Sequence, residues 1–283
     1  MKKELHITVQ SEDQTAVDIL STELLPFDIS RQRIKQAMQM GCVWLESSDQ
    51  KGQNFIQRLR RVKKILSKQD SIHCYYDSDI LETKPASAIL VSDEGEYSIW
   101  NKPAGMLSQG SKWGDHCTIN RWVEKNLKPE RPAFIVHRLD RAANGLIILA
   151  HKKKIASQFS NMFKEHQVQK HYEVLIKGNF QTSLNPNELT KTVTEDIDGK
   201  SAISHISLKE YDSISDESLL DVQIETGRKH QIRKHLSALT YPVIGDRLYG
   251  TKSNIDSSRD LQLKAKSLSF TCPVNKIVKT YII

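Results

Sequence analysis

The stretch VHRLDRAANGLIILA, from Val136 to Ala150, joins a charged half to an apolar half. The apolar half predicts a buried strand. The charged half places His137, Arg138, Asp140 and Arg141 directly before that strand. Folding alone gives no reason to put a carboxylate between two arginines at the start of a core element, so Asp140 is a candidate functional group. The alternative is a structural carboxylate that caps a turn and is held by one of the two arginines.

Composition indicates a folded, soluble protein. The chain has 283 residues, 38% hydrophobic and 27% charged, enough for one large domain or for one medium and one small domain. No apolar stretch follows the N-terminal lysines and no run is long enough to span a membrane, so neither a secretion signal nor membrane association is expected. The four cysteines are scattered without a CxxC pair, which favours reduced thiols. We expect a cytoplasmic monomer.

Basic residues gather in the N-terminal part of the chain. The net charge is only +7, but residues 51–68 contain seven basic residues and no acid, and residues 31–35 form a second acid-free cluster. A solvated helix face normally mixes signs, so the clusters predict phosphate binding. The first stretch contains Lys51, Arg58, Arg60, Arg61, Lys63, Lys64 and Lys68. The candidate RNA-binding residues are Arg31, Arg33, Lys35, Arg58, Arg60, Arg61, Lys63 and Lys64.

Residues 1–85 are expected to form a separate small α+β domain. SRQRIKQAMQMG predicts a helix with Ser30 as its N-cap and Gly41 as its stop, CVWLE and DSIHCYYD predict short strands, and ETKPASA is typical of a linker. This order of helix, short strand and basic stretch resembles the small αL RNA-binding domain also found in a ribosomal small-subunit protein. The alternative is a generic small α+β domain.

Residues 86–283 are expected to form a second domain, of the α+β class with a mixed or antiparallel sheet. YSIWNKPAG, HYEVLIKG and LLDVQIETG predict strands, two of them by alternation of apolar residues. TINRWVEKNL, KKIASQFSNMFKEH and RKHQIRKHLSAL place apolar residues at helical spacing. Strands with a few interspersed helices favour this class over a parallel α/β fold.

Four segments of the second domain together carry a family resemblance. They are NKPAG (101–105), HRLDRAANGL (137–146), KHYEVLIKG (170–178) and TGRKHQIRKHL (226–236). In kind, order and spacing they closely resemble the RluA-type RNA pseudouridine synthases, over roughly residues 89–283. The second and fourth segments together are highly specific, whereas either alone is only suggestive.

The resemblance implies isomerisation of uridine in RNA to pseudouridine, without a metal or other cofactor. The essential aspartate of such enzymes corresponds to Asp140, acting as a nucleophile or as a base at the ribose. The resemblance suggests Arg228 as its ion-pair partner. Tyr172 corresponds to the tyrosine that lies against the target base, with removal of the C5 proton as a second role. Arg138 corresponds to the arginine that fills the space left by the extruded uridine.

The same segments supply further candidates. The proposed substrate-binding residues are Arg138, His137, Asn101, Lys102, Lys170, His230, Gln231 and Arg233. His230 and His235 also invite a metal-site interpretation, but a separation of five does not place them on one helical face. In IGDRLYG, which we expect to be a loop that shapes the site, Asp246 is expected to form a turn and not to serve as a second catalytic acid.

The chain departs from the family pattern at three positions. Ala143 and Asn144 stand where a small hydroxyl residue and then serine are common, and Lys264 stands where histidine is usual. These departures put in doubt any transfer of substrate from a well-known member. Ribosomal RNA is the favoured substrate and transfer RNA the alternative. The rival functions are an RNA-binding or RNA-folding factor without catalysis, and a metal-dependent nuclease, which would need a carboxylate or histidine cluster.

Overall fold

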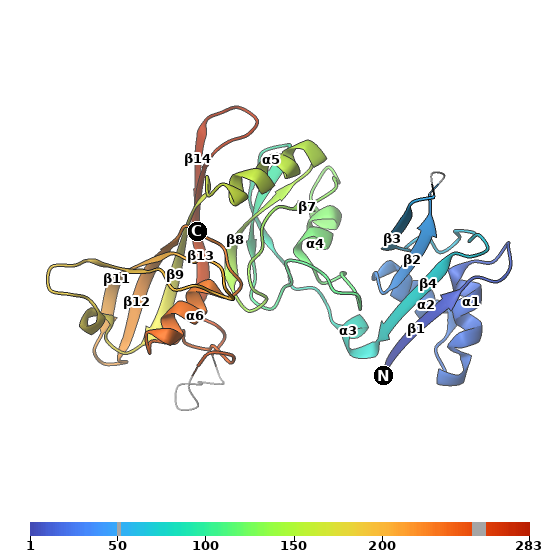
Figure 1. The fold of residues 1–283 in the computed structure, drawn as a ribbon, viewed down its shortest axis with the longest axis horizontal. Helices are drawn as coiled ribbons and strands as arrows, with labels where there is room; N and C mark the ends of the chain where they lie inside the picture. Colours follow the sequence, from blue (N-terminus) through green and yellow to red (C-terminus); the bar gives the residue numbers. More distant parts are fainter. Residues whose placement is uncertain (50–51, 251–258) are drawn as a thin grey trace. The chain divides into compact units, whose positions relative to one another are not determined.

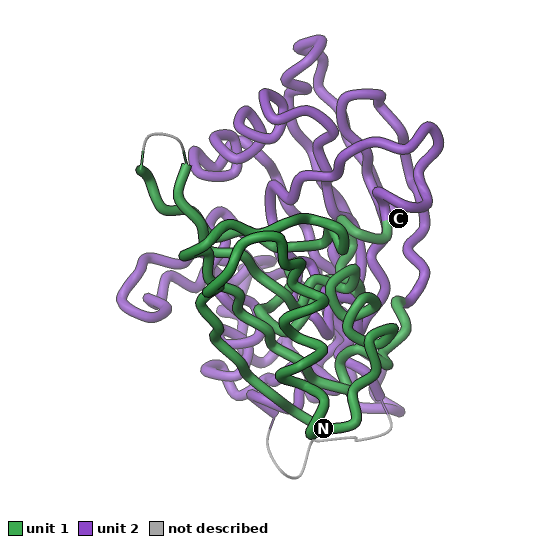
Figure 2. The backbone as a smooth tube through the Cα atoms, turned by 90° about the vertical axis from the view of Figure 1, so that its right-hand side faces the viewer, with its two compact units in different colours: residues 1–85, 109–122 green, residues 86–108, 123–283 purple. Residues whose placement is uncertain are grey.

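The computed structural model describes residues 1–49, 52–250 and 259–283, so Lys51 of the basic stretch lies outside the described residues. The chain divides into two compact units (Figure 2). Unit 1 consists of Met1–Pro85 and Gln109–Trp122, and unit 2 of Ala86–Ser108 and Val123–Ile283. The segment Gln109–Trp122, expected in the second domain, therefore packs with the N-terminal residues. Among the described residues, no helix combines the length and apolar character that a membrane crossing requires.

Unit 1 contains an antiparallel sheet in the order β1-β4-β2-β3 (Figure 1). The strands are β1 (Lys2–Thr8), β2 (Val43–Ser48), β3 (Asn54–Arg58) and β4 (Ser71–Asp77). The helices are α1 (Ala16–Glu23), η1 (Leu25–Phe27), α2 (Arg31–Gln39) and α3 (Ser78–Glu82). Alternate residues of β2 and β4 join the apolar residues of α1 and α2 in one core, so each strand has one buried and one more open face.

Local signals set the helices of unit 1. The Ser30 side chain accepts a hydrogen bond from the backbone N–H of Arg33 at 3.2 Å, and Gly41 follows α2 with a φ of +85°. The expected helix, its cap and its stop are therefore confirmed. The capping box between Thr15 and Asp18, which starts α1, was not anticipated from the sequence.

Unit 2 is built on a mixed sheet in the order β10-β11-β12-β9-β13-β8-β6-β5, with β14 paired to β13 and β7 to β8. Its strands are β5 (Ile89–Asp93), β6 (Tyr97–Lys102), β7 (Phe134–Ile135), β8 (Asn144–Ala150), β9 (Gln169–Lys177), β10 (Thr190–Val193), β11 (Ser204–Asp212), β12 (Glu217–Ile224), β13 (Leu263–Thr271) and β14 (Val278–Ile282). The described pairs are antiparallel except β8 with β13. The expected α+β class with a mixed sheet is confirmed.

Two helices of unit 2 stabilise the two halves of this sheet. Helix α5 (Lys153–Lys164) packs Ile155 and Phe159 into the core beside β8, and α6 (Gln231–Ala238) packs into the core of β9, β11 and β12. The remaining helices are α4 (Ile119–Asn126), within which the division between the units falls, and η2 (Phe180–Ser183).

A close approach of two strands explains the glycine of the second motif. Gly145 lies at the start of β8 with a φ of +113°, and a Cβ atom there would lie 2.4 Å from the carbonyl oxygen of Ala265 in β13. No side chain fits so close to a neighbouring backbone. Glycine thus allows β13 to lie against β8 at the point where the loop that carries Asp140 enters the sheet.

Candidate active site

The loop that carries Asp140 joins β7 to β8 and is fixed from both ends by buried polar groups. The Ser108 hydroxyl donates to the carbonyl of Leu139 at 2.7 Å and accepts from the N–H of the same residue at 3.0 Å. The N–H of Gly105 donates to the carbonyl of Arg141 at 2.8 Å. Because these bonds involve the backbone on either side of Asp140, they hold the backbone from which its side chain projects.

Lys102 stabilises the same loop through hydrogen bonds to backbone carbonyls. Its side chain is fully buried, and Nζ donates to the carbonyls of Pro103 at 3.0 Å, Met106 at 2.9 Å and Ala143 at 2.7 Å, with the carbonyl of Arg141 at 3.5 Å. Burial lowers the pKa of Lys102 to about 8, and the nearby charge of Asp140 opposes that shift. The expectation that Lys102 binds substrate is wrong, because backbone carbonyls surround its ammonium group.

Arg233 connects Asp140 to a second, buried carboxylate. Its Nη1 donates to Asp140 Oδ2 at 3.1 Å, while Nε and Nη2 donate to the two oxygens of Asp246 at 2.7 Å each. Both side chains of the second pair are nearly inaccessible, whereas the Asp140 side chain is 23% exposed. The arginine is thus held by the buried carboxylate and presents its remaining N–H to the exposed one.

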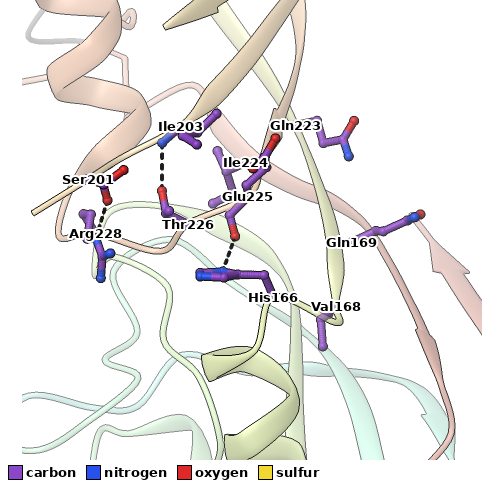
Figure 3. Close-up of a pocket in the computed structure, with 10 residues that line it drawn as sticks. All are labelled: His166, Val168, Gln169, Ser201, Ile203, Gln223, Ile224, Glu225, Thr226 and Arg228. Carbon is purple, nitrogen blue, oxygen red and sulfur yellow. Dashed lines mark hydrogen bonds between the residues drawn. The ribbon is translucent and has the colours of Figure 1, made fainter. Parts of the chain in front are cut away.

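The expected partner of Asp140, Arg228, lies elsewhere. Its Nε donates to the carbonyl of Ser201 at 2.8 Å, and the guanidinium borders a separate pocket (Figure 3). The prediction that Arg228 forms the ion pair is therefore wrong, and Arg233 takes that place. Both arginines belong to the same sequence motif, but Arg233 is the third residue of α6, whereas Arg228 precedes the helix.

The turn before α6 is built around Gln231, whose side chain is buried. Its Oε1 accepts from the Thr226 hydroxyl at 2.7 Å and from the N–H of Arg228 at 3.0 Å, and its Nε2 donates to the carbonyl of Ile203 at 2.9 Å. Gln231 was expected to bind substrate, but these bonds occupy its amide, so it shapes the turn instead. His230 follows that turn with a φ of +56°.

His230 lies beside the carboxylate without bonding to it. The distance from its Nε2 to Asp140 Oδ1 is 3.8 Å, and its Nδ1 lies 2.9 Å from the Tyr249 hydroxyl. Burial lowers the pKa of His230 although Asp140 opposes this. Among the described residues, Oδ1 accepts no hydrogen bond, so it is the oxygen of Asp140 that is open to a substrate.

Tyr172 lies in β9 with its neighbours Val222 in β12 and Ala265 in β13, and packs against the core of this half of the sheet. Burial, and then the charge of Asp140, raise the pKa of its phenol above the usual value. A neutral phenol is a poor proton acceptor, so this environment favours contact with a base over proton removal.

Two other expected substrate-binding residues, Lys170 and His137, make contacts within the protein. Lys170 is buried and its Nζ donates to the carbonyls of Glu225 at 3.3 Å and Thr226 at 3.4 Å; burial lowers its pKa to about 8. The His137 ring stacks on Phe163 and its Nε2 accepts from the backbone of β8 at 2.9 Å, and burial lowers its pKa to about 3. The expectation of substrate binding is wrong for the buried Lys170, whereas for the half-buried His137 it stays a prediction.

The two remaining candidates differ in exposure. Asn101 is half-buried in β6, opposite Leu146 of β8. Arg138 is exposed on the loop beside Asp140, as a residue that enters RNA would need to be. Their substrate contacts stay predictions.

Several arginines of the N-terminal clusters bind acids of the chain itself. Arg58 Nε lies 3.3 Å from Asp115, and Arg60 bonds to the same carboxylate. Arg31 donates to Asp18 at 2.6 Å and Arg33 to Glu82 at 3.2 Å. A basic cluster that contains no acidic residue in the sequence can therefore still have acidic residues as neighbours in the fold. Phosphate binding by Arg58 and Arg60 is not supported.

Arg58 and Arg60 attach the segment Gln109–Trp122 to the rest of unit 1. Arg58 Nη2 also donates to the carbonyl of Ser111 at 2.7 Å, and the indole of Trp44 donates to the carbonyl of Lys112 at 3.1 Å. The other four basic candidates are exposed or half-buried and make no described ion pair. They are Lys35, Arg61, Lys63 and Lys64.

The departures from the family pattern cluster in the structure. Asn144 of β8 and Lys264 of β13 are partners in the parallel pair, and Ala143 is buried in the core cluster against which Tyr172 also packs. The Asn144 Oδ1 atom is buried without a hydrogen-bond partner among the described residues. None of the three contacts the carboxylate oxygens of Asp140 by a described hydrogen bond.

Sequence reasoning missed part of the site. Asp246 forms the expected turn by accepting from the N–H groups of Leu248 and Tyr249, at 2.9 and 3.1 Å, but its bond to Arg233 was not anticipated. The Arg233 guanidinium also lies 5.1 Å from the centre of the Tyr249 ring. The two adjacent charged residues of the IGDRLYG loop, Asp246 and Arg247, were the available signal.

A family model described as RNA pseudouridylate synthase matches residues 96–238. Among curated proteins, ribosomal large subunit pseudouridine synthase C of Buchnera aphidicola subsp. Baizongia pistaciae is 32% identical over 209 residues, which is 66% of this chain and 64% of that protein. The tRNA pseudouridine synthase C of Vibrio parahaemolyticus is 28% identical over 216 residues, 67% of this chain and 87% of that protein.

The fold has counterparts among solved structures. Human RNA pseudouridylate synthase domain containing 1 has a TM-score of 0.57 at 22% identity and covers 71% of this chain and 86% of its own. Human RNA pseudouridylate synthase domain containing 4 has a TM-score of 0.53 at 21% identity, with 69% and 87% covered. At these identities the likeness establishes the fold of the covered part alone.

Proposed function

The chain belongs to the RNA pseudouridylate synthase family, and we propose that it isomerises uridine in structured RNA, ribosomal RNA in the first place, with Asp140 as its essential group. The pairing of this carboxylate with Arg233 carries the proposal. A reaction at one nucleotide requires a charged group that the substrate can reach and that the protein holds in place. The partly exposed carboxylate of Asp140, held by the buried Arg233, meets both requirements.

The reaction is an isomerisation that needs one well-placed carboxylate. The bond between N1 and C1′ breaks, the base turns over, and C5 joins C1′; the proton that leaves C5 is balanced by one gained at N1. Asp140 acts either as a nucleophile or as a base at the ribose, and in both cases Oδ1 is the reacting oxygen, because Oδ2 is bound to Arg233.

The surrounding groups bind and orient the nucleotide. Tyr172 contacts the target base through its ring, since its environment keeps the phenol neutral. The exposed Arg138 occupies the space from which the uridine is extruded, and this contact offsets part of the cost of unstacking. The ring of His230 borders the reacting oxygen, with its Nε2 3.8 Å from Oδ1.

Unit 1 supplies a second RNA contact in this proposal. Its helix, hairpin and basic residues are consistent with a small αL RNA-binding domain, and Lys35, Arg61, Lys63 and Lys64 are the residues open to phosphates. The names of the relatives include both ribosomal and transfer RNA enzymes, so transfer RNA is the alternative substrate. We further propose that the protein acts as a monomer in the cytoplasm.

Release of tritium from RNA labelled at C5 of uridine tests the activity. A synthase releases the label and leaves the chain intact, whereas an RNA-binding factor without catalysis releases none, and a nuclease cuts the RNA. Mapping of pseudouridine in total RNA, with and without the gene, then identifies the target. Absence of any gene-dependent pseudouridine, together with no label release from ribosomal or transfer RNA, would refute the proposal.

A further inference from the structure

A pocket of about 400 Å³ lies at the edge of the unit 2 sheet, where β9 begins and β12 ends. Its volume falls in the range of small-ligand sites, about 300–1,000 Å³. Arg228 is among its lining residues, whereas Asp140, Arg233 and Tyr172 are not (Figure 3). The pocket is therefore distinct from the site of the carboxylate.

One side of the pocket carries an imidazole and a guanidinium. Nδ1 of His166 bonds to the carbonyl of Glu225 at 2.7 Å, and since a carbonyl only accepts, this nitrogen carries a proton. Arg228 uses Nε on the carbonyl of Ser201, and no described residue accepts from its two terminal nitrogens. Figure 3 shows the His166 ring pointing toward this guanidinium.

The other side and the floor differ in chemistry. Gln169 and Gln223 lie on the opposite side, and their amides make no described hydrogen bond within the protein (Figure 3). The lining also includes Val168, Ile203 and Ile224, which are apolar. The carboxylate of Glu225, also on the rim, accepts from Nε2 of His205 at 2.7 Å.

We propose that this pocket binds one unpaired nucleotide of the RNA substrate, outside the target uridine. A base needs an apolar surface for its ring and mixed donors and acceptors for its edge, which the aliphatic residues and two glutamines provide. The terminal N–H groups of Arg228 are suited to the accompanying phosphate. This inference rests on the proposed action on RNA. It adds that Arg228, Gln169 and Gln223 help the protein to select its RNA target.

The pocket is coupled to the catalytic site through one short segment. The buried Gln231 bonds to both Thr226 and the N–H of Arg228, and two residues later Arg233 contacts Asp140. A nucleotide bound at Arg228 would therefore fix the start of α6, the helix that carries the partner of Asp140.

Binding of a short, unstructured, fluorescein-labelled RNA of mixed sequence to the full-length protein, followed by anisotropy, tests the proposal. Gln223→Ala should weaken binding about fivefold and Arg228→Gln about tenfold or more. The matched controls are Gln167→Ala, an exposed glutamine outside the pocket, and Lys229→Gln, which removes the neighbouring charge; each should change affinity by less than about twofold.

Equal losses for Arg228→Gln and Lys229→Gln, with Gln223→Ala unchanged, would overturn the proposal in favour of diffuse charge attraction. Competition by uridine 5′-monophosphate as effective as by the oligonucleotide would also overturn it, because the pocket would then suit a free nucleotide. Gln169→Ala provides a second neutral variant if Gln223→Ala does not fold. Label release is measured separately, so RNA binding in the pocket without isomerisation would refute the proposed function and leave this site standing.

Discussion

Replacing Arg233 by methionine should damage both the stability and the activity of the protein. The substitution Arg233→Met leaves Asp246 as a fully buried carboxylate with only backbone partners, and removes the only described hydrogen bond to the side-chain carboxylate of Asp140. Breaking one half of a buried ion pair costs about 3–5 kcal/mol. We expect the free energy of unfolding at neutral pH, measured by urea denaturation, to fall by that amount.

The loss should depend on pH in a defined direction. In the wild type, burial raises the pKa of Asp246, but hydrogen bonds from Arg233 and from two backbone N–H groups lower it by more. The net result is a pKa below the usual value of an aspartate. The pair therefore stabilises the protein above the pKa of an unfolded carboxyl, about 3.9, and this contribution is lost as pH falls through the folded value. Without the guanidinium, burial dominates and raises the pKa of Asp246, so the difference in unfolding free energy between the two proteins should narrow as the pH falls through that raised pKa.

Two companion variants separate charge from packing. Arg233→Met combined with Asp246→Asn removes the stranded charge and keeps an acceptor for the turn, so it should recover part of the stability but not the activity. Arg233→Lys keeps the charge without the planar fork, and we expect a loss in single-turnover rate on the order of 100-fold.

Arg228→Met is the matched control for these measurements, because it removes an arginine with one described hydrogen bond. Its unfolding free energy should stay within about 1 kcal/mol of the wild type, and its rate at saturating RNA should fall far less than that of Arg233→Lys. A collapsed rate in Arg228→Met with a normal rate in Arg233→Lys would show that Arg228 is the partner of Asp140 during the reaction, and would refute the reasoning.

Three further outcomes are expected. Asp140→Asn should abolish tritium release while RNA affinity and thermal unfolding stay close to wild type; residual turnover within a few-fold would contradict the assigned role. Gly145→Ala should lower the unfolding free energy by about 1–3 kcal/mol in urea, because the new Cβ meets the backbone of β13, and an unchanged value would mean that the strands can separate. Asp115→Asn should release Arg58 and Arg60 to bind phosphates. The slope of log RNA affinity against log salt concentration should then become steeper by about 1–2 units, and an unchanged slope would show that neither arginine reaches a phosphate.

The elements with strong local signals could be predicted from the sequence. The apolar run after Asp140 is β8, and the helix from Ser30 to Gly41 is α2, because strand burial and helix caps depend on residues a few positions apart. The position of Asp140 at the mouth of a core strand follows from the same local pattern. The four motifs indicated the family, because their order and spacing hold information that no single motif has.

Partners that come from distant parts of the chain could not be predicted in this way. Asp115 lies more than fifty residues after Arg58 and Arg60, and no local periodicity connects them. Arg228 and Arg233 share one motif, and only the turn around Gln231 decides which of them reaches the carboxylate. Lys102 looked like a ligand for RNA, because a buried lysine and an exposed one have the same sequence signature.

The two-segment construction of unit 1 bears on how the protein is made. A ribosome adds about 5–20 residues per second, so Met1–Pro85 is synthesised as a continuous stretch before Gln109–Trp122 exists. Until then, Arg58 and Arg60 lack Asp115, and Trp44 lacks its acceptor at Lys112. Ala86–Ser108, which belongs to unit 2, is made in between. The N-terminal unit therefore cannot mature alone during translation: its last contacts form only after the first strands of the second unit have been synthesised.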